Sequence, residues 1–169
     1  MSDGVLQPPR RLDSGDDRSQ FCSGADELDS WLRRFAWENQ RADNAVTYVT
    51  VRDGVVLGYY AIAMAGYATH QLPTRLQKNR PVETPCVLLA RLTVDRTAQG
   101  MGVGAGLLRH AIEQSFRLSE RVGAAALLIH CRDAAARAFY LANGDFAESP
   151  VEHAHLLLSM KEIRRRLGG

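Results

Sequence analysis

A run of glycines is the first feature of the sequence that suggests chemistry. The stretch RTAQGMGVGAG, residues 96–106, has glycine at every second position from Gly100 to Gly106, and the apolar spacing that begins at Leu107 predicts a helix directly after it. Glycine lets the backbone come close to a ligand, and successive N–H groups at the amino end of a helix can bind one anion. The stretch therefore has the composition of a phosphate-binding loop.

Two common phosphate-binding motifs explain this loop poorly. A P-loop places a lysine after its glycines, and the chain has no lysine between Lys78 and Lys161. The dinucleotide fingerprint G-x-G-x-x-A fits Gly100, Gly102 and Ala105. However, the next apolar run, AAALLIHC, lacks the terminal acid that binds ribose, and the motif begins too late in the chain for both halves of that fold. Glycines before a helix also occur in simple tight turns, so the surrounding elements must decide.

The elements around the loop alternate between strands and helices. Residues 87–94, VLLARLTV, and residues 124–131, AAALLIHC, are continuous apolar runs of strand length, as buried strands are. A helix that begins near Val103 separates them, and a short helix over 134–142, capped by Asp133, follows. The glycine loop is thus expected between a buried strand and a helix.

The segments before the loop predict a helix followed by a β-hairpin. Ser23 with Asp26 is typical of a helix cap, and the apolar spacing after them predicts a helix that ends near residue 39. Residues 45–52 and 55–65 flank the dipeptide Asp-Gly, which is typical of tight hairpin turns. After residue 144 the sequence predicts two more short strands.

Length and composition restrict the class of protein. The 169 residues are 46% hydrophobic, which suits one domain with a substantial core. We expect a loosely ordered arm over residues 1–18 and one domain over 19–169. No apolar run is long enough to span a membrane and the first residues are polar, which predicts a cytoplasmic protein with neither membrane anchor nor signal peptide.

The metal-binding residue types are scattered. The three cysteines lie far apart without a Cys-x-x-Cys pair, which indicates reduced side chains rather than a disulfide framework or a zinc ribbon. His153 and His155 would share one face of a strand, but two ligands without a third do not predict a metal site. We therefore expect no metal cofactor.

Residues 99–104 are similar to the Q/R-x-x-G-x-G/A loop of the GNAT N-acetyltransferases, which take an acetyl group from acetyl coenzyme A (acetyl-CoA). The order of elements around the loop is also similar to the core of that family. The resemblance implies an α+β, single-domain GNAT fold with a mixed, mostly antiparallel sheet of six to seven strands, splayed central strands and about four flanking helices. It further implies that backbone groups of the loop and of the strand before it bind the cofactor. The implied cofactor-binding residues are Leu92, Thr93, Val94, Gln99, Gly100, Met101, Gly102, Val103 and Gly104.

A narrower resemblance covers nearly the whole chain. The stretches FCSGADELDSWLRRFAWENQ, VTYVTV, GYYAIA, VLLARLTVDRTAQGMGVGAGLL and ARAFY are similar to the TacT-type toxins of bacterial toxin–antitoxin modules. Members of that family acetylate the α-amino group of aminoacyl-tRNA and so block translation. The resemblance implies an aminoacyl-tRNA substrate and a cognate ribbon-helix-helix antitoxin, through which alone the protein would reach operator DNA. It also allows a homodimer.

Basic residues are the candidates for receiving tRNA. The formal net charge is only +2, and arginine supplies all but two of the 21 Lys and Arg residues, which a GC-rich coding bias alone would explain. Residues 66–85 have no clear structural pattern but carry a basic cluster. We expect tRNA contacts from Arg75, Lys78, Arg80 and Arg91, whereas the basic C-terminal run reads as a solvated face.

Tyr140, in the short predicted helix, is the candidate catalytic residue. In the family that the sequence resembles, a tyrosine at this place faces the cofactor sulfur, and a phenol with a pKa of about 10 remains a proton donor at neutral pH. No general base stands out. Glu83 and Asp95 flank the central strand, Asp95 equally fits a role in the turn, and His130 at the end of a buried strand reads as structural. An α-amino group with a pKa of about 7.7–8.0 needs less help from a base than a lysine does.

Two other functions remain open at this point. A GNAT enzyme could acetylate a small-molecule or protein amine instead of aminoacyl-tRNA. A non-catalytic protein could bind acetyl-CoA and regulate a partner without transferring the acetyl group. The sequence does not indicate which aminoacyl-tRNA would be preferred.

Overall fold

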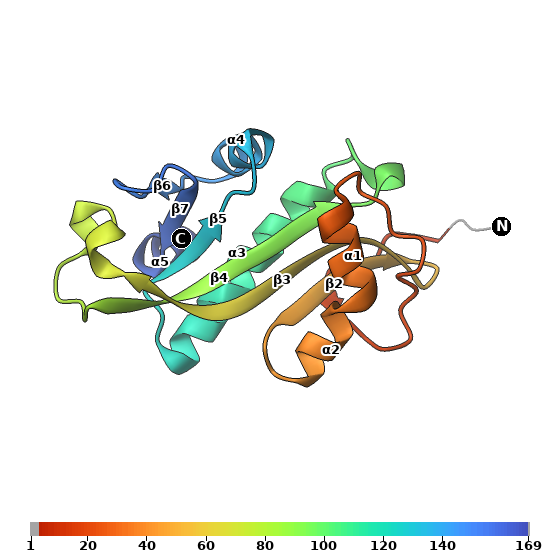
Figure 1. Ribbon diagram of the computed structural model, residues 1–169, viewed down its shortest axis with the longest axis horizontal. Helices are drawn as coiled ribbons and strands as arrows, with labels where there is room; N and C mark the ends of the chain where they lie inside the picture. Colours follow the sequence, from red (N-terminus) through yellow and green to blue (C-terminus); the bar gives the residue numbers. More distant parts are fainter. Residues whose placement is uncertain (1–3, 169) are drawn as a thin grey trace. The chain divides into compact units, whose positions relative to one another are not determined.

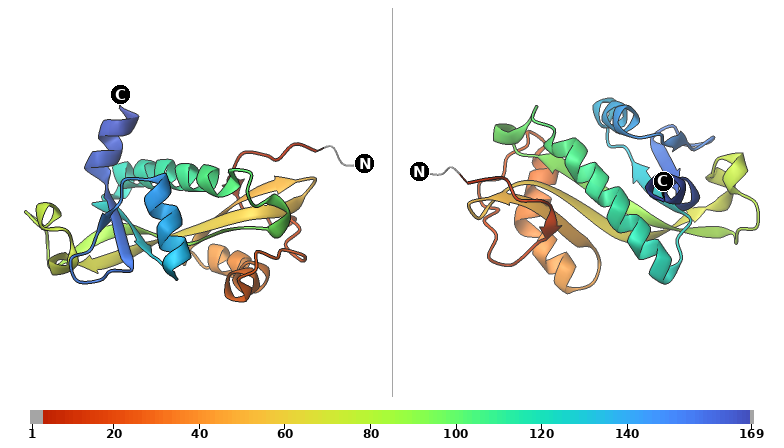
Figure 2. Two further views of the ribbon diagram at one scale, coloured as in Figure 1. Left: turned by 90° about the horizontal axis from the view of Figure 1, so that it is seen from above. Right: turned by 180° about the vertical axis from the view of Figure 1, so that it is seen from behind.

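The computed structural model describes residues 4–168 (Figures 1 and 2). It contains two compact units, the first formed by Met1–Ala63 with Ala90–Ala111 and the second by Met64–Leu89 with Ile112–Gly169. The seven-stranded sheet has the order β1-β2-β3-β4-β5-β7-β6, in which the pairing of β4 with β5 is parallel. The predicted α+β architecture with a mixed, mostly antiparallel sheet is confirmed. Strands β3 (Val55–Ala68) and β4 (Glu83–Val94) and helix α3 (Val103–Val122) run through both units.

The predicted hairpin forms in the first unit. Strand β2 (Val46–Arg52) pairs antiparallel with β3, and the turn places Asp53 at φ 52° and Gly54 at φ 78°. Two positive φ angles in succession are those of the tight turn that Asp-Gly favours, because its twist matches that of the strands. The Asp-Gly dipeptide therefore sets the register of the hairpin.

The helical segment before the hairpin is divided in two. The sequence predicted one helix up to about residue 39, but α1 (Asp26–Arg34) and α2 (Ala36–Arg41) are separated at Phe35, whose φ of −120° is not helical. The predicted helix cap at Ser23 is also absent, and Ser23 acts as a hydrogen-bond donor instead. Ser23 does not cap α1; its backbone N–H and its hydroxyl instead donate to the buried carboxylate of Asp29 in the first turn.

Both helices of this segment pack against the hairpin through one core. Its buried members include Phe21, Leu32, Val49 and Tyr59, and the ring of Trp31 stacks on Tyr59. Within the expected N-terminal arm, the short strand β1 (Arg10–Arg11) pairs with β2, and Leu12 is buried in the same core. These contacts tie part of the expected N-terminal arm to the first unit, while the domain boundary at residue 19 stays a prediction.

The second unit contains the remaining strands and helices. Strand β5 (Ala126–His130) pairs parallel with β4 from Cys86↔Ala126 to Leu89↔Ile129 and antiparallel with β7 (His155–Ser159), which also pairs with β6 (Ala147–Glu148). Helix α4 (Ala134–Asn143) follows β5, as predicted, with the Asp133 carboxylate accepting from the Ala136 N–H. The segment without a sequence pattern forms two short 3-10 turns, η1 (Thr69–Gln71) and η2 (Thr74–Leu76).

The C-terminal helix α5 (Met160–Leu167) was not predicted. Its amino end is capped by the Ser159 hydroxyl, which accepts from the Glu162 N–H at 3.1 Å. The spacing of Ser159 and Glu162 is that of a capping box, so the sequence carried a signal for this helix. Among residues 4–168, no helix combines the length and hydrophobicity needed to cross a membrane.

The position of α3 on the sheet depends on a close approach at Gly58, and this can be tested. A Cβ atom on Gly58 would lie 3.0 Å from Leu107 Cδ1 and 3.1 Å from Thr50 Cγ2. We therefore predict that Gly58→Val lowers the free energy of unfolding by about 1–3 kcal/mol, as overpacking does. Urea denaturation measures the change. Gly15→Val is the control, because a Cβ atom on Gly15 meets no atom within 4 Å. Equal stability of both variants would contradict the packing argument.

Candidate functional site

The glycine loop leaves a set of backbone donors without partners. Gly100 and Gly102 have φ angles of 78° and 80°, and α3 begins directly after them at Val103. Within residues 4–168, the amide groups from Gly100 to Ala105 have no hydrogen-bond partner, and the first helical bond runs from Gly106 N–H to Gly102 O at 3.1 Å. A Cβ atom on Gly100 or Gly102 would meet nothing within 4 Å, so the loop borders open space. Such a cluster of free N–H groups at a helix start binds anions, above all phosphate.

The carboxylate of Asp95 holds the entrance to this loop. One oxygen accepts from the Cys22 N–H at 2.8 Å, and the other accepts from both the N–H and the hydroxyl of Thr97. Burial raises the pKa of Asp95, but these hydrogen bonds outweigh burial and bring it below its ordinary value. Both oxygens are engaged, so the structure favours the role in the turn over that of a general base.

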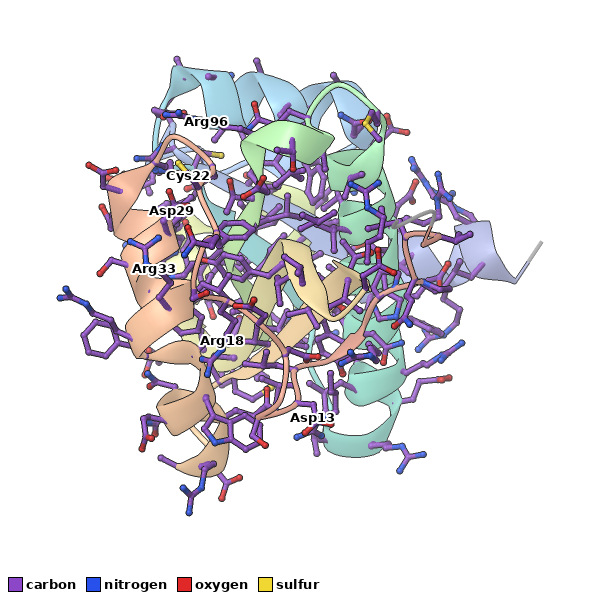
Figure 3. All side chains as sticks on the ribbon, turned by 90° about the vertical axis from the view of Figure 1, so that its right-hand side faces the viewer. Asp13, Arg18, Cys22, Asp29, Arg33 and Arg96 are labelled. Atoms are coloured by element: carbon purple, nitrogen blue, oxygen red, sulfur yellow. The ribbon has the colours of Figure 1, made fainter. Side chains whose placement is uncertain are left out.

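Gln99 braces the same loop from the other side. Its side-chain amide donates to Ser23 O at 3.0 Å and to Val94 O at 2.9 Å. The segment before α1 is itself fixed, because Arg96 N–H donates to Cys22 O and Arg33 donates to Phe21 O. Figure 3 labels Cys22, Arg33 and Arg96. The side chain of Gln99 thus holds the loop in place through main-chain acceptors on two other segments.

The strand before the loop changes character along its length. Up to Leu89 most of β4 is buried and pairs with β5, whereas the part of β4 from Ala90 to Val94 is half-buried. This second part contains Leu92, Thr93 and Val94, which the sequence assigned to cofactor binding. Their partial exposure is compatible with that assignment, and their contact with a cofactor stays a prediction.

Tyr140 lies in the second unit, on α4. Its side chain is buried, and its ring packs edge-on against Phe139 and Phe146. Burial raises the pKa of Tyr140, and the nearby Cys131 thiol acts in the same direction. The phenol therefore stays protonated at neutral pH, which is the form that a proton donor needs.

The four basic residues assigned to tRNA have different surroundings. In the first unit, the guanidinium of Arg91 lies over the ring of Trp31, 4.2 Å from its centroid. In the second unit, Arg80 donates to Leu76 O, Lys78 is exposed, and Arg75 lines a pocket of about 460 Å³. Arg91 thus belongs to the first unit and the other three residues to the second.

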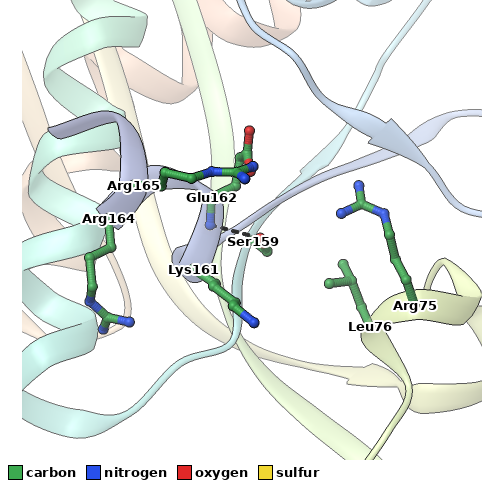
Figure 4. Close-up of a pocket in the computed structure, with 7 residues that line it drawn as sticks. All are labelled: Arg75, Leu76, Ser159, Lys161, Glu162, Arg164 and Arg165. Atoms are coloured by element: carbon green, nitrogen blue, oxygen red, sulfur yellow. Dashed lines mark hydrogen bonds and ion pairs between the residues drawn. The ribbon is translucent and has the colours of Figure 1, made fainter. Parts of the chain in front are cut away.

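That pocket unites two basic clusters that are far apart in the sequence. Arg75 and Leu76 of η2 form one side, and the first turns of α5 form the other (Figure 4). The single acid in the lining, Glu162, forms an ion pair with Arg165. We call these residues the basic pocket, and its lining consists of Arg75, Leu76, Ser159, Lys161, Glu162, Arg164 and Arg165. Sequence reasoning missed its C-terminal half, because α5 was not recognised as a helix.

The histidines do not form the pair that the sequence suggested. His153 precedes β7 and lies 3.6 Å from the Glu148 carboxylate, whereas His155 stacks on His130 of β5. No group of three or more potential metal ligands occurs among residues 4–168.

Comparison with known proteins decides the family. Residues 13–144 match the profile of the acetyltransferase (GNAT) family, and the chain is 41% identical over 160 residues to a tRNA-acetylating toxin of Mycobacterium tuberculosis (strain ATCC 25618 / H37Rv), covering 95% of this chain and 96% of that protein. The chain belongs to the GNAT acetyltransferase family. The GNAT fold and the acetyltransferase class expected from the glycine loop are therefore confirmed.

Two solved GNAT structures are similar over almost the whole chain. AtaT complexed with acetyl-methionyl-tRNAfMet is 27% identical with a TM-score of 0.88, covering 96% of this chain and 99% of that one. A mutant AtaT toxin bound to the C-terminus of the antitoxin AtaR is 25% identical with a TM-score of 0.81, covering 96% and 97%. The similarity therefore extends beyond residues 13–144.

The glycine loop of this GNAT protein makes a direct prediction. Gly102→Ala places a side chain at a φ of 80°, which strains the loop, and adds a methyl group beside the unpaired amides. We expect acetyl-CoA binding to weaken at least tenfold, because charge-assisted bonds each contribute about 1.5–3 kcal/mol. Isothermal titration calorimetry measures the dissociation constant.

Gly106→Ala is the matched control for that measurement. Gly106 lies in α3, and a Cβ atom there meets nothing within 4 Å. This variant should keep the affinity for acetyl-CoA and raise stability by about 0.5–1 kcal/mol, since alanine is the better helix residue. Unchanged affinity in Gly102→Ala would show that the loop does not bind the cofactor.

Proposed function

We propose that this GNAT protein transfers the acetyl group of acetyl-CoA to the α-amino group of an aminoacyl-tRNA and thereby blocks translation. The observation that carries the proposal is the 41% identity with a tRNA-acetylating toxin over nearly the full length of both chains. The similarity to AtaT complexed with acetyl-methionyl-tRNAfMet supports it independently. Acetylation of a small-molecule or protein amine, or a non-catalytic binding role, has no comparable support.

The loop before α3 fits the diphosphate of acetyl-CoA. Acetyl-CoA supplies an acetyl group activated as a thioester. The unpaired amides from Gly100 to Ala105 would hold the diphosphate, and the positive end of the α3 dipole would add to the attraction. Leu92, Thr93 and Val94 would direct the cofactor arm through their backbone groups. Asp95 and Gln99 would fix the loop in this form before the cofactor binds, which lowers the entropic cost of binding.

Tyr140 would act as the general acid. When the bond between the acetyl carbon and sulfur breaks, the leaving thiolate needs a proton or a hydrogen bond. A phenol whose pKa is raised by burial is protonated throughout the neutral range and can donate to that sulfur. The rings of Phe139 and Phe146 would hold Tyr140 in one orientation and exclude water from it.

The basic pocket would receive the tRNA backbone. Arg75, Lys161 and Arg164 add positive charge there, while the charge of Glu162 is already paired. Lys78 and Arg80 flank this side in sequence, and Arg91 would contribute from the first unit. Local clustering of this kind explains how a chain with a net charge of only +2 could bind a polyanion.

We also propose a cytoplasmic toxin neutralised by a cognate ribbon-helix-helix antitoxin, with operator DNA contacted through that antitoxin. The TacT-like sequence pattern supports this view, as does the similarity to an AtaT toxin bound to the C-terminus of the antitoxin AtaR. A homodimer is compatible with it.

Transfer of a labelled acetyl group tests the proposed function. The protein should move label from acetyl-CoA to the aminoacyl end of charged tRNA and leave uncharged tRNA unlabelled. Tyr140→Phe, which keeps the ring, should lower kcat by about 100-fold or more, in the usual range for a general acid. Acetyl-CoA affinity and thermal stability are the controls for this variant. Label in a free amine but not in charged tRNA would contradict the proposed substrate, and an unchanged kcat would remove Tyr140 from the reaction.

Salt dependence tests the role of the basic pocket. Arg75→Ala combined with Lys161→Ala should weaken tRNA binding and lower the slope of log Kd against log salt concentration by about one per lost phosphate contact. Arg117→Ala is the control, because Arg117 is an exposed arginine of α3 outside the pocket. Filter binding over a salt series measures both slopes. The same slope in all three proteins would contradict the tRNA contact.

A further inference from the structure

Two imidazole rings stack where β5 ends. His130 is the last residue of β5 and is paired in register with His155, the first residue of β7. Their ring centroids are 4.0 Å apart with an angle of 19° between the planes. Neither side chain had a role in the proposed function, and only the antiparallel register of β5 and β7 brings them together.

The inner ring of this stack is fixed by a buried phenol. Tyr67 of β3 is 5% exposed, and its hydroxyl lies 2.9 Å from His155 Nδ1. Burial raises the pKa of Tyr67, so its hydroxyl stays protonated at neutral pH. Its hydrogen bond with Nδ1 holds the ring of His155 in one orientation. It forms a rigid support for the ring of His130.

The outer ring is accessible. His130 is exposed, and within the described residues 4–168 no hydrogen bond or ion pair engages its ring nitrogens. This contradicts the sequence interpretation of His130 as a satisfied structural histidine. Partial burial lowers its pKa and the neighbouring His155 lowers it further, while Glu152 acts in the opposite direction. At neutral pH the ring is thus an uncharged proton acceptor.

The place of His130 in the fold relates it to Tyr140. The parallel pairing of β4 with β5 ends at Leu89↔Ile129, and His130 and Cys131 come next. Successive residues of an extended chain point to opposite faces. The Cys131 thiol raises the pKa of Tyr140, and Asp133 and Arg137 of the α4 region act on the pKa of Cys131. Cys131 is therefore on the side of α4. His130 occupies the other face. A group at this strand end therefore has a proton donor on one face and a proton acceptor on the other.

We propose that His130 is the general base of the acetyl transfer, with His155 and Tyr67 as positioning residues. This inference rests on the proposed function. The amine nitrogen forms a bond to the acetyl carbon, one N–H proton passes to the free ring nitrogen of His130, the carbon–sulfur bond breaks, and the thiolate takes a proton from Tyr140. The proton on His130 then returns to solvent and the Tyr140 phenolate takes one from solvent, which restores both groups, and no oxidant or reductant is needed.

The other carboxylates and imidazoles are less suited to this role. Both oxygens of Asp95 are occupied by Cys22 and Thr97, and Glu83 folds over Gly66, where a Cβ atom would lie 2.9 Å from its carboxylate oxygen. His153 is held near the Glu148 carboxylate. A weak base also suffices chemically. The attacking amine enters neutral, but the nitrogen becomes strongly acidic once it is bonded to the acetyl carbon, and a neutral imidazole can then remove its proton.

The pH profile of kcat/KM separates a base from a structural residue. In the wild-type protein both the substrate α-amine, with a pKa of about 7.7–8.0, and His130 must be unprotonated. The plot of log kcat/KM against pH should therefore approach a slope of two on the acid side. In His130→Gln it should approach one, and the rate at neutral pH should fall about 100-fold, as for loss of a general base. Free imidazole should restore part of the activity of His130→Ala.

His153→Gln is the matched control, since His153 is a neighbouring histidine outside the stack. It should keep the wild-type slope and rate. Tyr67→Phe should lower kcat, keep the slope of two and leave the KM for acetyl-CoA unchanged. A His130→Gln protein with the wild-type slope, or a loss in His130→Ala that imidazole does not restore, would overturn the proposal. These results require a wild-type protein that acetylates charged tRNA, so a wild type that transfers no acetyl group would refute the proposed function instead.

Discussion

The unpaired amides at the start of α3 are the feature on which the site depends. A helix cannot satisfy its own first N–H groups, and the glycines before α3 leave further amides pointing away from the protein. Water can accept hydrogen bonds from such donors, but a diphosphate forms stronger ones, because bonds to charged phosphate oxygens are charge-assisted. The preference of the loop for phosphate would therefore come from its main-chain N–H groups. It needs no lysine, which explains why the P-loop pattern is absent.

Three polar side chains hold this loop and the segment before α1 in place, and two of them, Asp29 and Asp95, are buried. The carboxylate of Asp95 and the amide of Gln99 bind main-chain groups from before α1 and from the end of β4. The carboxylate of Asp29 binds Ser23 in the same segment. Residues 22–23 are therefore part of the support of a loop that lies more than seventy positions later in the chain. The glycines allow the loop to adopt positive φ angles, and these hydrogen bonds then hold it in one conformation.

The sequence predicted the parts of the fold whose signals are local. The Asp53-Gly54 hairpin, the buried strands β4 and β5 and the cap of α4 each depend on a few neighbouring residues, and each is present. The role of Ser23 was missed, because its hydrogen bond to the buried Asp29 overrides the local cap signal, and the interruption at Phe35 was missed as well. Helix α5 had a recognisable capping box in Ser159 and Glu162, but the run of arginines after it was interpreted as a solvated face.

The same difference between local signals and tertiary contacts applies to the site residues. The glycine loop and Tyr140 could be proposed from short motifs, whereas the basic pocket and the histidine stack depend on contacts between distant segments. Arg75 meets α5 only through tertiary structure. His130 meets His155 only because β5 and β7 pair in one particular register, and a shift by a single residue would turn the two rings to opposite faces of the sheet. In the proposed function, the motif residues would hold the cofactor, while register and packing determine which groups would accept a proton and an RNA chain.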